Sequence, residues 1–203
     1  MTNGAENPVK QFWDWFGANA KAIAADVENS IWPTEIDDRL LNLAPGLSWE
    51  IGPGKTRPWQ LVISPNLDRE LRETARAIVA EAPELDGWEF YSSRQPKDWK
   101  FKFELEGQDE AATLSINAAA WHFVLLKYPG GRREILLRAI GLQDLDHERR
   151  QQVGEIVLEG LLGEDILLDS VEDFDIVDEF DPQFVIHARP IQRLRAALTG
   201  EDC

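Results

Sequence analysis

The chain has little of what builds disulfides or membrane spans. Its only cysteine is Cys203, the last of 203 residues, so no intramolecular disulfide can form and a reducing compartment is favoured. No apolar run is long enough to span a bilayer. Residues 1–6 do not form the basic and then apolar start of a signal peptide. These absences predict a cytoplasmic protein with no membrane partner.

Basic residues are also scarce. Acidic residues outnumber them 37 to 21, which gives a net charge of −16. Phosphate backbones would be repelled by such a chain, so nucleic acid is excluded as a partner. A basic protein is the partner class that this charge permits, because a strong negative field attracts positive surfaces.

Enough apolar material is present for a sizeable core, since 43% of the residues are hydrophobic and eight are tryptophan. Apolar residues at three- and four-residue steps predict an N-terminal helix over 8–29. A strand pair over 47–51 and 59–64 should follow. The next helix, over 67–82, is expected to be capped by Asn66, and a strand over 88–92 comes after it.

The second half shows a similar order. Strict alternation predicts a strand over 99–106, with Trp99, Phe101 and Phe103 inward and Lys100 and Lys102 outward. Further strands are expected over 114–117, 121–128 and 134–140, with a hairpin turn at 129–131. A helix capped by Asp146 should end at Gly163, ahead of a last strand within 166–177 and a short helix over 190–198.

The fold class that these elements predict is α+β. We expect mixed, mainly antiparallel sheets with helices packed on one side, in a single domain over 1–203 with lobes at 1–106 and 107–203. After the N-terminal helix, the order β-β-α-β occurs twice. An internal duplication would explain this repetition, and so would coincidence, because the order is a common one.

No motif for catalysis withstands inspection. Gly54-Lys55-Thr56 resembles the end of a phosphate-binding loop, but Trp49 stands where the first glycine is needed and a strand follows instead of a helix. His147-Glu148 lacks a second histidine one turn later. His122 and His187 are expected to be hydrogen-bonded core or edge residues. We therefore predict no catalytic residue, no cofactor and no metal site.

An acidic stretch over 164–181 contains no lysine or arginine. A calcium loop starting at Asp173 would need glycine where Asp178 stands, so that kind of site is not favoured. The stretch could be a solvated strand edge whose charges prevent aggregation, or a docking face for a basic partner or for the chain's own C-terminal arginines. The candidate partner-binding residues are Asp173, Asp175, Asp178 and Glu179.

One small positive cluster stands out against this background. The loop that contains Ser93, Arg94 and Lys97 follows a strand and offers a hydroxyl, a guanidinium and an ammonium group. Such a loop could bind a carboxylate or a phosphate, or it could be an ordinary polar connection.

Three segments carry a family resemblance, over 12–16 (FWDWF), 61–66 (LVISPN) and 82–88 (APELDGW). They resemble a group of uncharacterised bacterial proteins classed as domains of unknown function. The resemblance covers the first half of the chain and implies a bacterial origin, with no activity and no functional residues.

Charge and the lack of catalytic motifs favour a non-enzymatic protein-binding or regulatory role. An immunity or inhibitor protein, steered electrostatically onto a basic toxin or nuclease, is one concrete version. The alternatives are an enzyme that acts on a small anionic substrate near Arg94, and a structural subunit of a larger assembly. A deep pocket with converging titratable groups would favour the enzyme, and a flat charged surface the binder.

Overall fold

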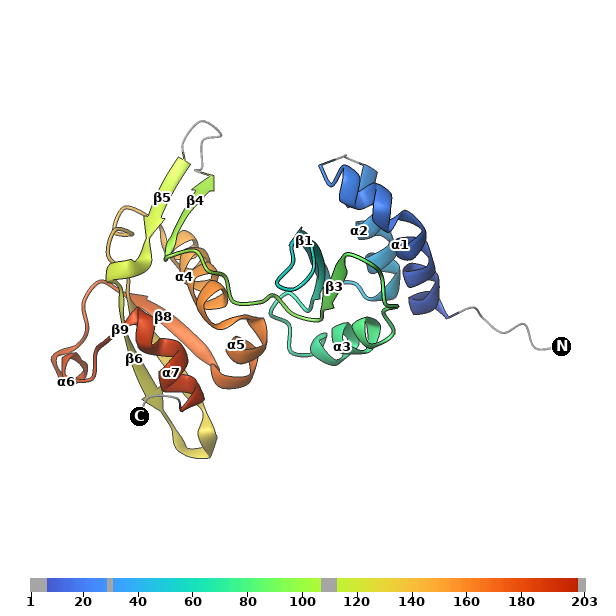
Figure 1. The fold of residues 1–203 in the computed structure, drawn as a ribbon. Coiled ribbons are helices and arrows are strands. Elements are labelled where there is room, and N and C mark those ends of the chain that lie inside the picture. Colours follow the sequence, from blue (N-terminus) through green and yellow to red (C-terminus); the bar gives the residue numbers. More distant parts are fainter. Residues whose placement is uncertain (1–6, 29–30, 107–112, 201–203) are drawn as a thin grey trace. The chain divides into compact units, whose positions relative to one another are not determined.

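The computed structural model describes residues 7–28, 31–106 and 113–200, and it divides into two compact units (Figure 1). The first unit ends at Arg94 and the second begins at Gln95, whereas the sequence places a lobe boundary after Glu106. Both units combine helices with sheets, and of the six strand pairings among the described residues four are antiparallel and two are parallel. The predicted α+β class is confirmed.

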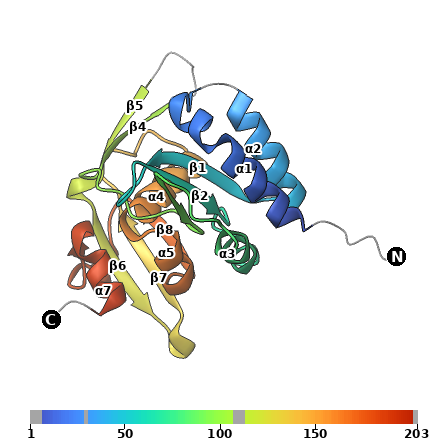
Figure 2. The ribbon, with the colours of Figure 1, turned by 45° about the vertical axis from the view of Figure 1, so that its right-hand side comes forward.

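The first unit begins with two helices, α1 (Pro8–Ala25) and α2 (Ile31–Leu43), which lie side by side (Figures 1 and 2). Strands β1 (Ser48–Pro53) and β2 (Trp59–Ser64) form an antiparallel hairpin. Helix α3 (Arg72–Ala80) then leads to β3 (Trp88–Tyr91), which pairs with β2 in parallel. The sheet order is therefore β1-β2-β3.

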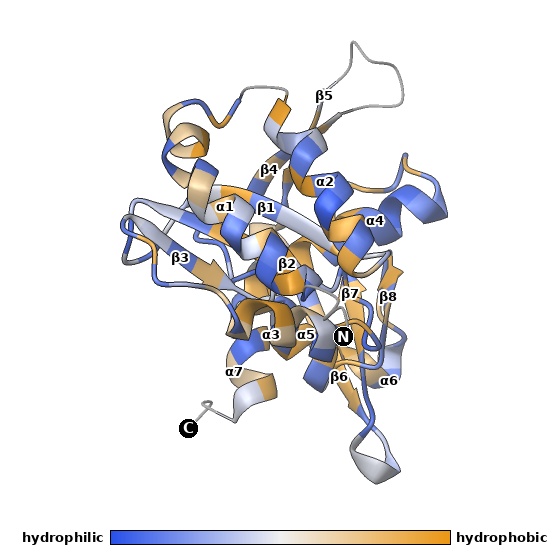
Figure 3. Ribbon diagram, turned by 90° about the vertical axis from the view of Figure 1, so that its right-hand side faces the viewer, coloured by the Kyte–Doolittle hydropathy of each residue, from blue (hydrophilic) through white to orange (hydrophobic). Residues whose placement is uncertain are grey.

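All three helices of this unit pack on one face of its sheet. Leu61 and Ile63 of β2 are fully buried and belong to the same hydrophobic cluster as residues of α1, α2 and α3. The side chains of Trp49, Trp59 and Trp88 join that cluster because register places them on the same face. Hydrophobic and hydrophilic residues are interspersed along α1 and α2 in Figure 3, as expected for helices with one buried face.

The aromatic run at the start of α1 forms the centre of this core. Phe12, Trp13 and Phe16 are buried. Phe16 makes edge-to-face contacts with Trp88 and Phe90, whose ring centroids lie 5.0 and 5.9 Å away. Trp13, which the helical stripe leaves aside, is buried in the same cluster, and its indole donates to the Ile78 carbonyl at 2.8 Å. The run is therefore core material and not a surface recognition element.

Two sequence predictions for this unit need correction. Helix α2 was not expected; its apolar signal is sparse, since only Ile36 and Leu40 are buried. The predicted cap at Asn66 is wrong, because Asn66 and Leu67 have positive φ angles of 56° and 60° and form a turn. Helix α3 starts later, at Arg72, with no side-chain cap.

The second unit begins with a hairpin of β4 (Lys102–Glu106) and β5 (Thr113–Asn117). A four-stranded sheet in the order β8-β7-β6-β9 follows. Its strands are β6 (His122–Lys127), β7 (Arg133–Arg138), β8 (Asp173–Val177) and β9 (Arg189–Pro190). Helices α4 (His147–Leu162) and α5 (Glu164–Ser170) connect β7 to β8, and α6 (Pro182–Val185) and α7 (Leu194–Thr199) lie near the C-terminal end.

Helix α4 packs on this sheet over β8 (Figure 2). Its start is as predicted, because the Asp146 side chain accepts from the Arg149 backbone N–H at 2.8 Å. Helix α4 can lie this close to β8 because residue 154 is glycine; an added Cβ there would meet Phe174 and Ile176 at 2.8 Å. Register places these two residues beside Ile135 and Leu137 of β7, so all four face the helix.

The predicted strand over 99–106 is shorter in the structure. Lys100 and Phe101 have positive φ angles of 52° and 60°, so the chain turns there and β4 begins at Lys102. Trp99, Phe101 and Phe103 still cluster, with ring centroids 6.1 and 5.0 Å from Trp99, and all three are half-buried. Lys100 and Lys102 are exposed as predicted.

The two units repeat one strand pattern. A shift of 74 residues carries the β1–β2 pairs, from Ser48↔Ser64 to Pro53↔Trp59, onto the β6–β7 pairs, from His122↔Arg138 to Lys127↔Arg133. The connecting loops agree too: Gly54 N donates to Pro58 O at 3.2 Å and Tyr128 N to Arg132 O at 2.9 Å. In each unit a helical crossover then adds a strand parallel to the second one. This shared topology supports duplication, and the two-fold relation between the copies stays a prediction.

Candidate functional site

Strand β8, at one edge of the four-stranded sheet, carries two of the four predicted acidic residues. Asp173 and Asp175 are exposed, while Phe174 is half-buried and Ile176 is buried under α4. Asp178 and Glu179, which follow the strand, are exposed as well. We call these four residues, Asp173, Asp175, Asp178 and Glu179, the acidic edge. The alternation of β8 is what holds the first two carboxylates outward.

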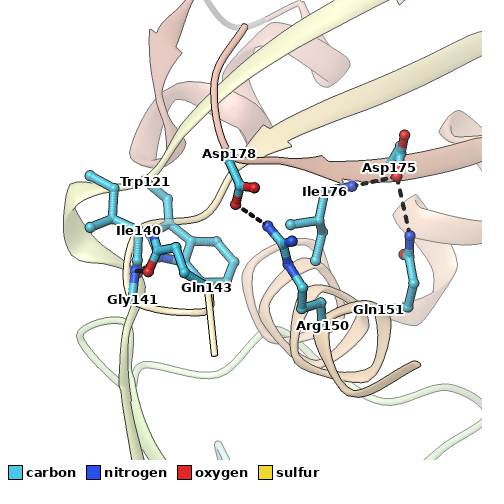
Figure 4. Close-up of polar contacts among 9 residues, drawn as sticks. All are labelled: Trp121, Ile140, Gly141, Gln143, Arg150, Gln151, Asp175, Ile176 and Asp178. Carbon is cyan, nitrogen blue, oxygen red and sulfur yellow. Dashed lines mark hydrogen bonds and ion pairs between the residues drawn. The ribbon is translucent and has the colours of Figure 1, made fainter. Parts of the chain in front are cut away.

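Helix α4 anchors two members of the acidic edge (Figure 4). The guanidinium of Arg150 forms an ion pair with Asp178, and Gln151 Nε2 donates to Asp175 Oδ1 at 3.3 Å. The Arg150 side chain is 17% exposed, whereas that of Asp178 is 60% exposed. Asp178 thus has a structural partner and still faces solvent, and Asp173 Oδ1 accepts from the Phe174 backbone N–H at 2.8 Å.

The acidic stretch as a whole is not one exposed face. The last strand predicted within 166–177 is β8, and residues 164–170 before it form helix α5, which the sequence did not predict. Glu164, the first acid of the stretch, is fully buried at the start of that helix, and Asp165 is half-buried. The docking face suggested for 164–181 is therefore reduced to the acidic edge.

The residues of the proposed anion-binding loop belong to different units of the chain. Ser93 is buried and Arg94 is half-buried in the first unit. The Arg94 guanidinium donates to the Ser48 hydroxyl at 2.8 Å, and its Nε lies 4.0 Å from Glu50 Oε2. Lys97 belongs to the second unit, where it is exposed and its backbone N–H donates to Gly160 O at 2.8 Å. A bound anion would compete with Glu50 for the guanidinium.

Residues 54–56 form a loop that binds a carboxylate, and the sequence did not predict this anion site. We call the loop the anion cradle. The Glu89 carboxylate accepts from the backbone N–H of Lys55 and of Thr56, the latter at 3.1 Å, and from the Thr56 hydroxyl at 2.5 Å. The hydroxyl is the main cause of a lowered pKa for Glu89, and the two backbone N–H groups add to it. Burial, reinforced by the charge of Glu89, raises the pKa of Tyr91.

This cradle uses the tripeptide Gly54-Lys55-Thr56, whose resemblance to a phosphate loop was rejected on sequence. An added Cβ at Gly54 would meet Glu89 Oε1 at 2.7 Å and Trp59 O at 3.0 Å, so only glycine fits. The loop therefore binds an anion of the protein itself. Spacing alone could not show this, because Glu89 comes from β3 and lies more than thirty residues away.

The histidines and possible metal ligands give no further site. His122 Nδ1 lies 3.1 Å from the Ala120 carbonyl, and His147 and His187 are exposed. Within the part of the chain that the structure describes, no three His, Cys, Asp or Glu side chains gather closely enough to hold a metal ion.

Comparison with protein-family models, curated proteins and solved structures found no match for the chain. The resemblance to uncharacterised bacterial proteins, and the bacterial origin that it implies, stay predictions. Among the residues described, no helix is both long and apolar enough to cross a membrane.

Proposed function

We propose that this chain is a non-enzymatic binding protein that docks a basic surface of a partner protein on its acidic edge. The observation that carries the proposal is the alternation of β8: Asp173 and Asp175 are exposed while Phe174 and Ile176 turn inward. The fold thus holds several carboxylates at one sheet edge, where they can act together on an approaching cation.

Electrostatic steering is the mechanism that this arrangement supports. A net charge of −16 accelerates the encounter with any basic protein, and a local cluster of carboxylates directs the partner to one place. An inhibitor or immunity role for a basic toxin or nuclease is the concrete version, because fast capture matters most for such proteins.

Solvated charges at a strand edge can also serve only to prevent edge-to-edge aggregation. The two roles differ in one respect. A protective edge needs charge alone and has no partner, whereas a docking edge has a partner whose binding depends on these four positions.

Affinity capture from the source cells, with three forms of the full chain as bait, tests the proposal. The edge variant Asp173→Asn, Asp175→Asn, Glu179→Gln spares Asp178 because Arg150 pairs with it. The control variant Asp38→Asn, Asp98→Asn, Glu104→Gln removes the same charge from exposed positions outside α4 and the acidic edge.

A basic protein captured by the wild type and the control variant, and lost by the edge variant at low salt, is the expected result. Equal capture by all three baits would contradict the proposal.

A further inference from the structure

The opposite edge of the same sheet is only partly covered. Strand β9 pairs with β6 through His122↔Pro190 and Phe123↔Arg189. Beyond Phe123, no strand in the described ranges pairs with the outer side of β6. The second half of β6 is therefore a free strand edge.

Hydrogen-bond positions show which backbone groups face this free edge. Ile191 N donates to Trp121 O at 3.0 Å on the β9 side, and bonded pairs of an antiparallel ladder recur at every second residue. On the other side, Tyr128 N donates to Arg132 O, so the even-numbered residues of β6 bond to β7. The N–H and C=O groups of Leu125 and Lys127 consequently point to the free edge.

Among the residues that the structure describes, this edge of β6 has no neighbouring strand because the segment before Arg189 turns away from it. His187 N donates to Phe184 O at 2.9 Å and Ala188 N to Val185 O at 3.2 Å, which closes a helical turn where a strand could have continued. A cavity of about 450 Å³ remains beside β6. Its apolar lining includes Phe123, Leu125 and Ala197.

Charge in this groove has the opposite sign to that of the chain. Among the described residues, three titratable ones line it, and all are basic: Lys127, His187 and Arg189. All three are exposed, in a chain with a net charge of −16. Ile186, which also lines the groove, is 82% exposed, so apolar surface is offered next to the cationic groups.

We propose that this groove binds the C-terminal segment of a partner polypeptide as an added strand. The segment would run antiparallel to β6 in line with β9, bonding to the backbone of Leu125 and Lys127. Because β9 occupies the edge from Phe123 onward, the added strand must end there, which brings its terminal carboxylate next to Arg189. Its last apolar side chain would pack on Phe123, Leu125 and Ala197.

The proposal is independent of the acidic edge, because β8 and β6 lie toward opposite edges of the sheet. The two surfaces also prefer ligands of opposite charge. Failure of one proposal therefore leaves the other unaffected.

The probe is a pool of randomised heptapeptides with free C-terminal carboxylates, together with the same pool carrying C-terminal amides. Both pools are passed over the immobilised full chain, and bound peptides are identified by mass spectrometry. We expect peptides with an apolar last residue to be enriched from the free-carboxylate pool, with affinities on the order of tenfold higher than those of their amides.

Two pairs of variants locate the binding. Ala197→Trp fills the groove and should abolish enrichment, whereas Thr199→Trp, exposed on the same helix, should not. Arg189→Gln should lower affinity on the order of tenfold, and Arg193→Gln, exposed outside the groove, should leave it unchanged. The arginine pair keeps the test valid if Ala197→Trp fails to fold.

Three results would overturn the proposal. Equal enrichment of free and amidated peptides would show that no carboxylate is recognised. Enrichment that persists in both groove variants would place binding elsewhere. A dimer in sedimentation experiments that Ala197→Trp dissociates would assign the groove to a second copy of the chain.

Discussion

Arg150 of α4 and Asp178 after β8 form an ion pair that joins the helix to the acidic edge of the sheet (Figure 4). The guanidinium is mostly buried and the carboxylate mostly exposed. Loss of the carboxylate would leave a largely buried cation without this charge partner, and such a group is costly.

Asp178→Asn should therefore reduce the free energy of unfolding by about 1–2 kcal/mol. Glu179→Gln, at the exposed neighbouring position, should change it by less than about 0.5 kcal/mol. Urea denaturation followed by circular dichroism measures both values. Equal stability of the two variants would show that Arg150 does not depend on Asp178.

Gly54→Ala should destabilise the first unit by about 1–3 kcal/mol, because the new methyl group would collide with the backbone carbonyl of Arg57 and with the Glu89 carboxylate. Gly52→Ala is the matched control, since nothing lies within 4 Å of a Cβ added there. Thermal and urea unfolding of the pair give the comparison. If both variants unfold alike, the glycine at position 54 is not a steric requirement of the cradle.

The Glu89 cradle makes stability depend on pH. The pKa of Glu89 is lowered from 4.5 in the folded protein, mainly by the Thr56 hydroxyl, so ionised Glu89 favours the folded state. This contribution is fully present above the unfolded value, near 4.5, and is lost as pH falls through the lower folded value.

The difference in unfolding free energy between the wild type and Glu89→Gln should hence be constant from pH 7 to about 5 and shrink below it. Urea titrations at successive pH values measure it. A difference that does not change down to pH 3 would mean that the carboxylate is not held in its charged form.

Phe16→Ala should cost about 3–5 kcal/mol, because this ring is fully buried between α1 and the first sheet. Asp14→Ala, on the exposed face of the same helix, should cost no more than about 1 kcal/mol through loss of its pair with Lys10. A cost below about 1 kcal/mol for Phe16→Ala would show that this ring is not part of the core.

Local patterns were sufficient to predict most elements. The bounds of β2 agree with the strand predicted over 59–64, and the capping residue of α4 is the predicted Asp146. Helix α5 was missed because an acidic composition hides the few apolar positions, Leu167 and Leu168, that it buries.

Contacts between distant segments could not be predicted in this way. Arg94 is bonded to Ser48, and Glu89 to the loop after β1, through the pairing of strands far apart in the chain. The turn at Lys100 and Phe101 requires positive φ angles that neither residue type favours, so alternation through them predicted a strand that starts too early. At the turn, as at the Arg94 and Glu89 contacts, tertiary packing overrides the local preference of the sequence.

The most direct test of the proposed function is the association rate of the captured partner as a function of ionic strength. The edge variant Asp173→Asn, Asp175→Asn, Glu179→Gln and the control variant Asp38→Asn, Asp98→Asn, Glu104→Gln carry the same net charge and differ only in where the charge is lost. We predict that the association rate falls steeply with added salt for the wild type and the control variant, and that it is lower and depends less on salt for the edge variant. Identical salt dependence of the two variants would contradict it, because binding would then respond to total charge and not to the acidic edge.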